Sequence, residues 1–339
     1  MAGVDRSVMW QFMGHSRART LLSRSLEAGQ LSHAYLFVGP PHVGKLTLAL
    51  DLARAVNCQA DRVPCGECAA CRRIAEGNHS DVKIIGREEQ HKVITISQVR
   101  EMDNDASLPP FEGRCKVFIF DGAELLSQDA ANRLLKTLEE PPSNVLIILL
   151  TSREKDVLPT IISRCQRVEL PPLPIDVVRE TLTERYMIDD EKAELLARVS
   201  GGCLGWAIQA TQDGGLLEER DRRLNALAGL VHAGLLERFT YAAELANRFS
   251  KSREDVEELL SLWIQWWRDL LILKCGQSGP VTNVDRLSVL SGQAETLSTE
   301  QIVGFIRRLQ DARKYLEQNA NPRLVFEVLM LNMPQEKPS

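Results

Sequence analysis

The segment that most constrains the fold is a glycine-rich loop between an apolar strand and a helix. Leu36-Phe37-Val38 is a short apolar run, and Gly39-Pro-Pro-His-Val-Gly-Lys45 follows it directly. After Lys45, apolar residues recur at helical spacing through Val56. A strand, this spacing of glycines and lysine, and a helix form the context that a Walker A phosphate loop requires. The alternative is a turn that only happens to hold two glycines and a lysine, but the context favours a phosphate loop.

The same loop lacks a residue that Mg²⁺ binding needs. The position after the lysine normally carries Ser or Thr, whose hydroxyl ligates Mg²⁺, and this chain has Leu46 there. Thr47 cannot simply replace it, because one residue along a helix turns a side chain by about 100°. His42 also places a bulky ring where a small residue usually lets the backbone approach phosphate. We therefore expect Mg-ATP binding to be weakened or lost.

A second acidic motif is also incomplete. In ATPases of this class a core strand ends with an Asp for the Mg²⁺ shell, and a Glu that polarises the attacking water follows. Val117-Phe118-Ile119-Phe120 supplies the strand and Asp121 the first carboxylate, but Gly122 occupies the second position. Glu124 lies two residues further, where we expect the chain to point it elsewhere. Asp121 is interpreted either as a remnant of the Mg²⁺ site or as a cap of the following turn.

The degenerate nucleotide site thus comprises five residues, and ATP or ADP is a doubtful ligand for it. These residues are Gly39, Gly44, Lys45, Thr47 and Asp121.

Strands alternate with helices up to about residue 170, which predicts a doubly wound α/β domain with a parallel sheet. Further strands are expected at 93–96 and at 145–150, the second being an uninterrupted apolar run that is typical of a buried parallel strand. Beyond this point the pattern is helical. We expect four regions: an α/β domain over 1–170, a small helical domain over 171–213, a helical block over 214–333 and a tail over 334–339.

The C-terminal block contains a broad apolar helical stripe from Val256 to Leu273, which predicts a helix core. Trp266 lies off the main face of this stripe. It is therefore expected to contribute to a subunit interface, where tryptophan is enriched.

Composition restricts the cellular setting and the partners. The net charge of −5 gives no global basic field, so any nucleic-acid contact has to be local or shared with partner subunits. No apolar run approaches the roughly 20 residues of a membrane span. Residues 1–10 lack the apolar core of a signal peptide. These features favour the cytoplasm, where thiols stay reduced.

Four of the eight cysteines fall within the segment 58–71, inside the predicted α/β domain: Cys58, Cys65, Cys68 and Cys71. Zn²⁺ takes four thiolates tetrahedrally, and C-x2-C steps aim neighbouring sulfurs at one ion. We therefore predict a structural Zn²⁺ site, with an Fe–S cluster as the open alternative because its ligands are the same. His79 lies nearby but is surplus to four cysteine ligands.

Several of these segments together resemble one protein family, the clamp-loader AAA+ ATPases of bacterial DNA polymerase III. The resemblance rests on His33-Ala-Tyr-Leu-Phe37, on Asn132-Arg-Leu-Leu-Lys-Thr-Leu-Glu-Glu-Pro-Pro142 and on Ser163-Arg164-Cys165. It is close over roughly 12–210 and looser beyond. It implies a P-loop AAA+ domain with a zinc module, a helical lid and a C-terminal collar domain. The implied partners are tau/gamma and delta subunits and, through the complex, the sliding clamp and primed DNA.

The resemblance also implies a role for Arg164. In such rings the arginine of this motif reaches the γ-phosphate held by a neighbouring subunit, as an arginine finger. A guanidinium suits that task because it presents a fixed fork of donors and a permanent charge. The alternative is that Arg164 pairs with a local carboxylate. Thr151-Ser152 falls at the position that reads the γ-phosphate, and no arginine occupies the second-sensor region around Gly202–Ala207.

We therefore expect a non-hydrolysing ring subunit that supplies Arg164 in trans. The runner-up is an active tau/gamma-like ATPase in which Glu124 or a partner's residue compensates for the losses. A stand-alone DNA-binding protein is disfavoured by the acidic balance.

Overall fold

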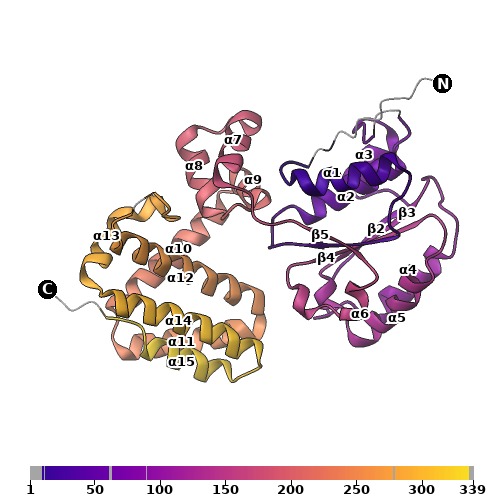
Figure 1. Cartoon of the computed structure of the whole chain (residues 1–339). Coiled ribbons are helices and arrows are strands. Elements are labelled where there is room, and N and C mark those ends of the chain that lie inside the picture. The colour runs from indigo at the N-terminus through magenta and orange to yellow at the C-terminus, as the bar shows by residue number, and fades with distance from the viewer. Residues whose placement is uncertain (1–9, 11, 61–62, 89, 278, 336–339) are drawn as a thin grey trace. The chain divides into compact units, whose positions relative to one another are not determined.

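The computed structural model describes residues 10, 12–60, 63–88, 90–277 and 279–335. It divides into two compact units: Met1–Val178 with Gly202–Trp206, and Arg179–Gly201 with Ala207–Ser339. The first is an α/β unit and the second is helical (Figure 1). The three-domain division expected from the sequence stays a prediction. The segment 1–9 and most of the expected tail, 336–339, lie outside the described residues.

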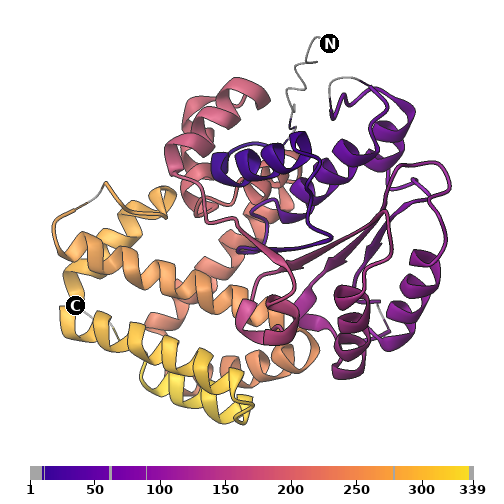
Figure 2. The ribbon, with the colours of Figure 1, turned by 45° about the vertical axis from the view of Figure 1, so that its right-hand side comes forward.

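A parallel sheet forms the centre of the first unit (Figure 2). It has five strands in the order β2-β3-β4-β1-β5. Its strands are β1 (Ala34–Val38), β2 (Val82–Ile85), β3 (Lys116–Asp121), β4 (Val145–Thr151) and β5 (Gln166–Glu169). Strand β4 is central and buried along its whole length, which explains its uninterrupted apolar sequence. The carboxyl ends of β1, β3 and β4 meet at one edge, because Val38 pairs with Thr151 and Asp121 pairs with Leu150.

Helices cover both faces of this sheet. Its helices are α1 (Ser16–Glu27), α2 (Lys45–Asn57), α3 (Ala69–Ala75), α4 (Ile96–Ala106), α5 (Gln128–Glu139) and α6 (Pro159–Ile162). Strand β1 shows how the faces divide: Tyr35 and Phe37 pack with α1 and α2, whereas Ala34 and Leu36 pack with α4 and α5. Alternate side chains of a strand point to opposite faces, so both faces need apolar residues. The predicted doubly wound α/β fold is confirmed.

The strand expected at 93–96 is wrong. Thr95 is instead the N-cap of α4, where its side chain and that of Gln98 form a capping box. Ile94 keeps only an isolated bridge to Leu126. The strand that completes this side of the sheet is β2, which the sequence analysis did not identify.

The second unit is built from helices, as expected for the C-terminal region. The remaining helices of the chain are α7 (Ile175–Tyr186), α8 (Asp190–Val199), α9 (Leu204–Gln212), α10 (Gly215–His232), α11 (Leu235–Lys251), α12 (Arg253–Lys274), α13 (Leu287–Thr296), α14 (Thr299–Glu317) and α15 (Pro322–Leu331). The apolar stripe of α12 forms the centre of a large core. Trp266 is only 1% exposed, and its indole N–H donates to Gln293 Oε1 at 3.0 Å. The expected role of Trp266 in a subunit interface is therefore wrong, because α13 covers its side chain.

Candidate functional site

The glycine-rich loop joins β1 to α2 and needs both of its glycines. A Cβ on Gly39 would lie 2.4 Å from the carbonyl oxygen of Leu170. Gly44, the N-cap of α2, has φ 105°, and a Cβ there would lie 2.6 Å from the ring of Phe12. His42 has φ 58°, in the left-handed region that a non-glycine residue rarely adopts. The loop is therefore held in one shape by its neighbours as well as by its own sequence.

Lys45 is satisfied by the loop itself. Its Nζ donates to the carbonyl oxygens of Gly39 at 2.7 Å and Pro40 at 2.8 Å, and to Ser152 Oγ at 3.0 Å. An ammonium has three hydrogens to donate, so these contacts use all of them. Burial lowers the pKa of Lys45, and the charges of Glu124 and Asp121 oppose that shift. A phosphate at Lys45 would have to displace existing hydrogen bonds.

The residues after Lys45 do not restore the missing magnesium ligand. Leu46 is partly buried and packs against the apolar core between the sheet and helices α1 and α2. Thr47 is exposed on α2, and among the described residues no hydrogen bond links it to the loop. The structure thus brings together Gly39, Gly44 and Lys45, but leaves Thr47 outside that group.

The end of β3 places two carboxylates near the loop. Asp121 is where the sequence predicted it, and burial of its carboxyl raises its pKa while Lys45 opposes the shift. Glu124 was expected to point away, and this expectation is wrong. Gly122, with φ 94°, turns the chain into the short 3-10 turn Ala123–Leu125. Glu124 Oε1 consequently accepts from the Ser152 N–H at 3.1 Å, and its other oxygen is buried without a hydrogen-bond partner among the described residues.

The backbone conformation at Gly122 disfavours a catalytic glutamate. A Cβ built there would lie 2.8 Å from Leu125 Cδ1, and the positive φ would strain any side chain. The missing second carboxylate is therefore a property of the backbone as well as of the residue type. Restoring it would require the turn after β3 to change.

The region expected to carry a second-sensor residue packs closely on the loop. A Cβ on Gly205, at the start of α9, would lie 2.5 Å from the carbonyl oxygen of His42. Nearby, burial raises the pKa of Cys203, and the charge of Lys45 opposes that shift. Backbone therefore fills the space beside the loop in this region.

Arg164 follows the short helix α6 and is bonded locally. Its Nη2 lies 2.5 Å from Glu139 Oε1 at the end of α5, and its Nη1 donates to the Thr160 carbonyl at 3.0 Å. The Arg164 and Glu139 side chains are 35% and 51% exposed, so solvent weakens the pair. The local carboxylate that the sequence analysis left open is therefore present. Its identity was not predicted, although Glu139 belongs to the motif that carries the family resemblance.

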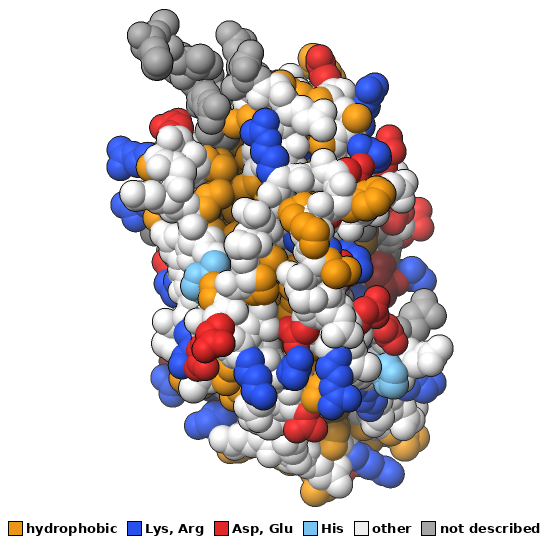
Figure 3. Space-filling model, turned by 90° about the vertical axis from the view of Figure 1, so that its right-hand side faces the viewer, with side chains coloured by type: hydrophobic (Ala, Val, Ile, Leu, Met, Phe, Trp, Pro, Cys, Tyr) orange, Lys and Arg blue, Asp and Glu red, His pale blue; other side chains and the backbone are white. Residues whose placement is uncertain are grey.

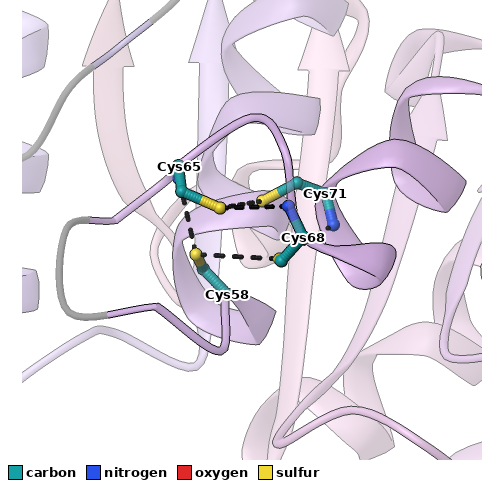
Figure 4. A group of neighbouring side chains, drawn as sticks. All are labelled: Cys58, Cys65, Cys68 and Cys71. Atoms are coloured by element: carbon teal, nitrogen blue, oxygen red, sulfur yellow. Dashed lines mark hydrogen bonds between the residues drawn. The ribbon is translucent and has the colours of Figure 1, made fainter.

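The four cysteines converge on one point (Figure 4). All four sulfurs lie within 4.8 Å of one another, with Cys58 Sγ 4.0 Å from Cys68 Sγ and Cys65 Sγ 3.9 Å from Cys71 Sγ. Sulfurs bound tetrahedrally at a Zn–S distance of about 2.3 Å would be about 3.8 Å apart. His79 is not part of the group, and its Nδ1 accepts from the Asp81 N–H. The residues therefore fit a Zn²⁺ ion.

Backbone hydrogen bonds to the sulfurs strengthen this fit. The N–H groups of Cys65, Cys68 and Cys71 point at the sulfurs of Cys58, Cys65 and Cys68, at 3.4, 3.2 and 3.5 Å. Such donors stabilise thiolates, the form in which cysteine binds metal. The cluster closes the segment between α2 and α3, and a full set of four thiolates is typical of a structural site.

Comparisons with known proteins give the class of this chain. A family model described as "DNA polymerase III, delta subunit" matches residues 14–174, and "DNA polymerase III, delta subunit, C terminal" matches residues 217–335. The chain belongs to this family of DNA polymerase III clamp-loader subunits. Among curated relatives, "DNA polymerase III subunit delta'" of Bacillus subtilis is 28% identical over 332 residues, which cover 97% of this chain and 99% of that protein.

Tau subunits are also similar, over a smaller share of their length. The Bacillus subtilis tau subunit is 28% identical over 95% of this chain and 61% of its own length. The Escherichia coli tau subunit is 35% identical over 59% of this chain and 32% of its own length. A solved gamma subunit-related protein from Thermotoga maritima aligns with a TM-score of 0.43 at 21% identity, over 95% of this chain and all of that one. Within the described part of the chain, each helix is too short or too polar to cross a membrane.

Proposed function

We propose that this chain is a non-hydrolysing subunit of the DNA polymerase III clamp loader that supplies Arg164 to the ATP site of a neighbouring subunit. The observation that carries the proposal is Leu46. It occupies the position of the magnesium hydroxyl and packs into the apolar core, so the loop has no ligand for the metal that accompanies ATP. Gly122, whose positive φ would strain any side chain, adds a second loss in the same chemistry.

Arg164 is suited to act outside its own unit. It is partly exposed and held by a weak surface pair. A phosphate group offers Arg164 more negative charge than one carboxylate does, and the phosphate oxygens accept the same forked hydrogen bonds. We infer that Arg164 exchanges Glu139 for the γ-phosphate of the neighbour when the ring assembles with ATP.

The proposed partners follow from the relatives. Proteins named tau and delta' are subunits of DNA polymerase III, so we propose that this chain assembles with tau/gamma and delta subunits. Through that complex it would support loading of the sliding clamp onto primed DNA. Zn²⁺ is the proposed structural metal at the four cysteines.

An active tau/gamma-like ATPase is the second candidate, and Glu124 favours it. This carboxylate lies near Lys45 and has one buried oxygen free of hydrogen bonds among the described residues. It could thus take the part of the glutamate that Gly122 replaces. Its other oxygen is tied to the Ser152 backbone, which limits how far it can reach toward a water molecule.

Hydrolysis by the purified chain separates the two candidates. We expect no phosphate release from Mg-ATP above the buffer background, and the same result for Lys45→Ala, because the magnesium ligand is missing. Phosphate release is followed over hours at saturating ATP. Turnover that Lys45→Ala abolishes would establish the active ATPase and refute the non-hydrolysing subunit.

Releasing Arg164 from Glu139 should accelerate the neighbouring site. In the reconstituted complex at subsaturating ATP, we expect Glu139→Gln to raise the hydrolysis rate by about 2–5-fold, because an exposed ion pair is worth at most about 1 kcal/mol. The measurement is the initial rate of phosphate release.

Glu140→Gln is the matched control, since Glu140 is the adjacent exposed glutamate in the same motif. We expect it to leave the rate unchanged. Glu139→Gln should also have no effect when Arg164→Ala is already present. An equal effect of Glu139→Gln with and without Arg164 would show that Glu139 acts by another route.

A further inference from the structure

Helix α1 carries three arginines that no carboxylate pairs with among the described residues: Arg17, Arg19 and Arg24. Elsewhere in the chain most arginines lie in ion pairs, as Arg133 does with Asp103 and Arg223 does with Asp255. The first turn of α1 has no acidic residue, and its N-cap provides no side-chain hydrogen bond. Among the described residues these three arginines therefore lie in no ion pair, and Glu27 of the same helix is the acidic residue beside Arg19 and Arg24.

Two hollows lie along this helix. The first, of about 480 Å³, is lined by Arg17 and Arg24 and by the hydroxyl residues Ser16, Thr20 and Ser25. The second, of about 360 Å³, is lined by Arg19, Arg24, Trp10 and Glu27, together with hydroxyl residues. Ser16, Thr20 and Arg24 line both hollows, so the two lie next to each other on α1. The surface that carries Arg17, Arg19 and Arg24 is here called the α1 strip.

One atom in the α1 strip specifically lacks an acceptor. Arg19 Nε is buried and has no hydrogen-bond partner among the described residues. A buried donor without an acceptor costs about 1–3 kcal/mol, and a bound anion beside it would supply that acceptor. The indole of Trp10 in the same hollow is fixed by its N–H, which donates to Ser23 Oγ at 2.8 Å.

The arrangement favours an extended anion over a compact one. Arg17 and Arg24 are seven residues apart on the same helix face, which separates them by about 10 Å along the axis. One strand of B-form DNA carries a phosphate about every 3.4 Å along its axis, so the strip matches a short stretch of backbone. Guanidinium forks and hydroxyls are the groups that contact phosphodiesters.

We propose that the α1 strip binds the phosphate backbone of nucleic acid. Figure 3 shows acidic and basic side chains interspersed on one face of the molecule, and the net charge is −5, so binding at the α1 strip would not rest on a global basic field. Helix α1 lies on one face of the sheet, and α4 and α5 cover the other face of the sheet. The proposal is independent of Arg164 and of ATP hydrolysis.

The test is fluorescence anisotropy of a labelled duplex oligonucleotide with the full chain, at salt concentrations from about 50 to about 200 mM. We expect Arg17→Gln with Arg24→Gln to weaken binding by at least about 10-fold at low salt. It should also reduce the slope of log K against log salt by about 1.8, because each phosphate contact contributes about 0.9. Arg17→Lys with Arg24→Lys keeps the charges and should keep the slope.

Arg307→Gln with Arg308→Gln is the matched control. It removes the same two charges from an exposed part of α14, where neither arginine has an ion pair among the described residues. We expect it to leave affinity and slope unchanged. Equal weakening by both double variants, no binding by the wild-type chain, or displacement of the oligonucleotide by polyglutamate at equal charge would each overturn the proposal. Thermal melts verify that every variant is folded.

Discussion

Replacing Arg164 with alanine is expected to slow hydrolysis at the ATP site next to this chain by about 10³-fold or more, the usual worth of an arginine finger. The guanidinium would stabilise charge that develops on the γ-phosphate. The motif Ser163-Arg164-Cys165 contains no second arginine that could replace it. The measurement is the burst of phosphate release from the reconstituted complex in a single turnover. The burst should lose the contribution of one site.

The controls separate the guanidinium from the fold around it. Arg167→Ala removes a nearby arginine of similar exposure, 41%, which pairs with Glu154 and Glu169. It should change the burst by less than about 2-fold, since exposed pairs contribute little. Arg164→Lys should restore little, because an ammonium lacks the fork. A wild-type burst from the Arg164→Ala complex would refute the role in trans.

The second large effect is expected at the cysteine cluster. Protein purified without chelator should contain about one Zn²⁺ per chain, as four converging thiolates bind one ion. Cys68→Ser should lower the metal affinity by more than about 100-fold. Losing only a residue that hydrogen-bonds to a metal ligand already costs up to about 100-fold, and Cys68 would be a ligand itself. Cys68 also caps α3, where its sulfur accepts from the Cys71 N–H. Mass spectrometry measures the metal content, and competition with a chromogenic chelator measures the metal affinity.

Cys275→Ser provides the control for this change, because Cys275 is an exposed thiol far along the sequence at the end of α12. It should leave the metal content unchanged. A metal content near zero in the wild-type chain would rule out the site. Iron with visible absorption would instead support the Fe–S alternative.

The parts of the fold that follow local rules were predictable. The buried strand β4 and the loop before α2 are continuous in sequence, and their residue types specify strand, turn and helix directly. The edge strands β2 and β5 were not predicted. Each has only four residues with mixed exposure, so pairing with a neighbouring strand, and not a distinct pattern, makes it a strand.

The sequence located Gly39, Gly44 and Lys45 in one loop, but it did not predict their contacts, and the structure places Thr47 apart from them. Lys45 bonds Ser152 across a separation of 107 residues, and no local pattern encodes such a pairing. Glu124 was misplaced because the positive φ of Gly122 redirects the chain, and a glycine only permits that conformation. The cysteine cluster was the easiest part, since its members lie close together in sequence and metal geometry limits their spacing.

The central claim is that this chain contributes an arginine to a neighbour's site but hydrolyses no ATP in its own loop. The most direct test is the steady-state ATPase rate of the reconstituted complex with Lys45→Ala in this chain alone. Only within that complex could a partner subunit supply the catalytic groups that the loop of this chain lacks. The assay of the complex is therefore also the most demanding test. We expect a rate equal to that of the wild-type complex. A rate reduced by half or more would contradict the central claim.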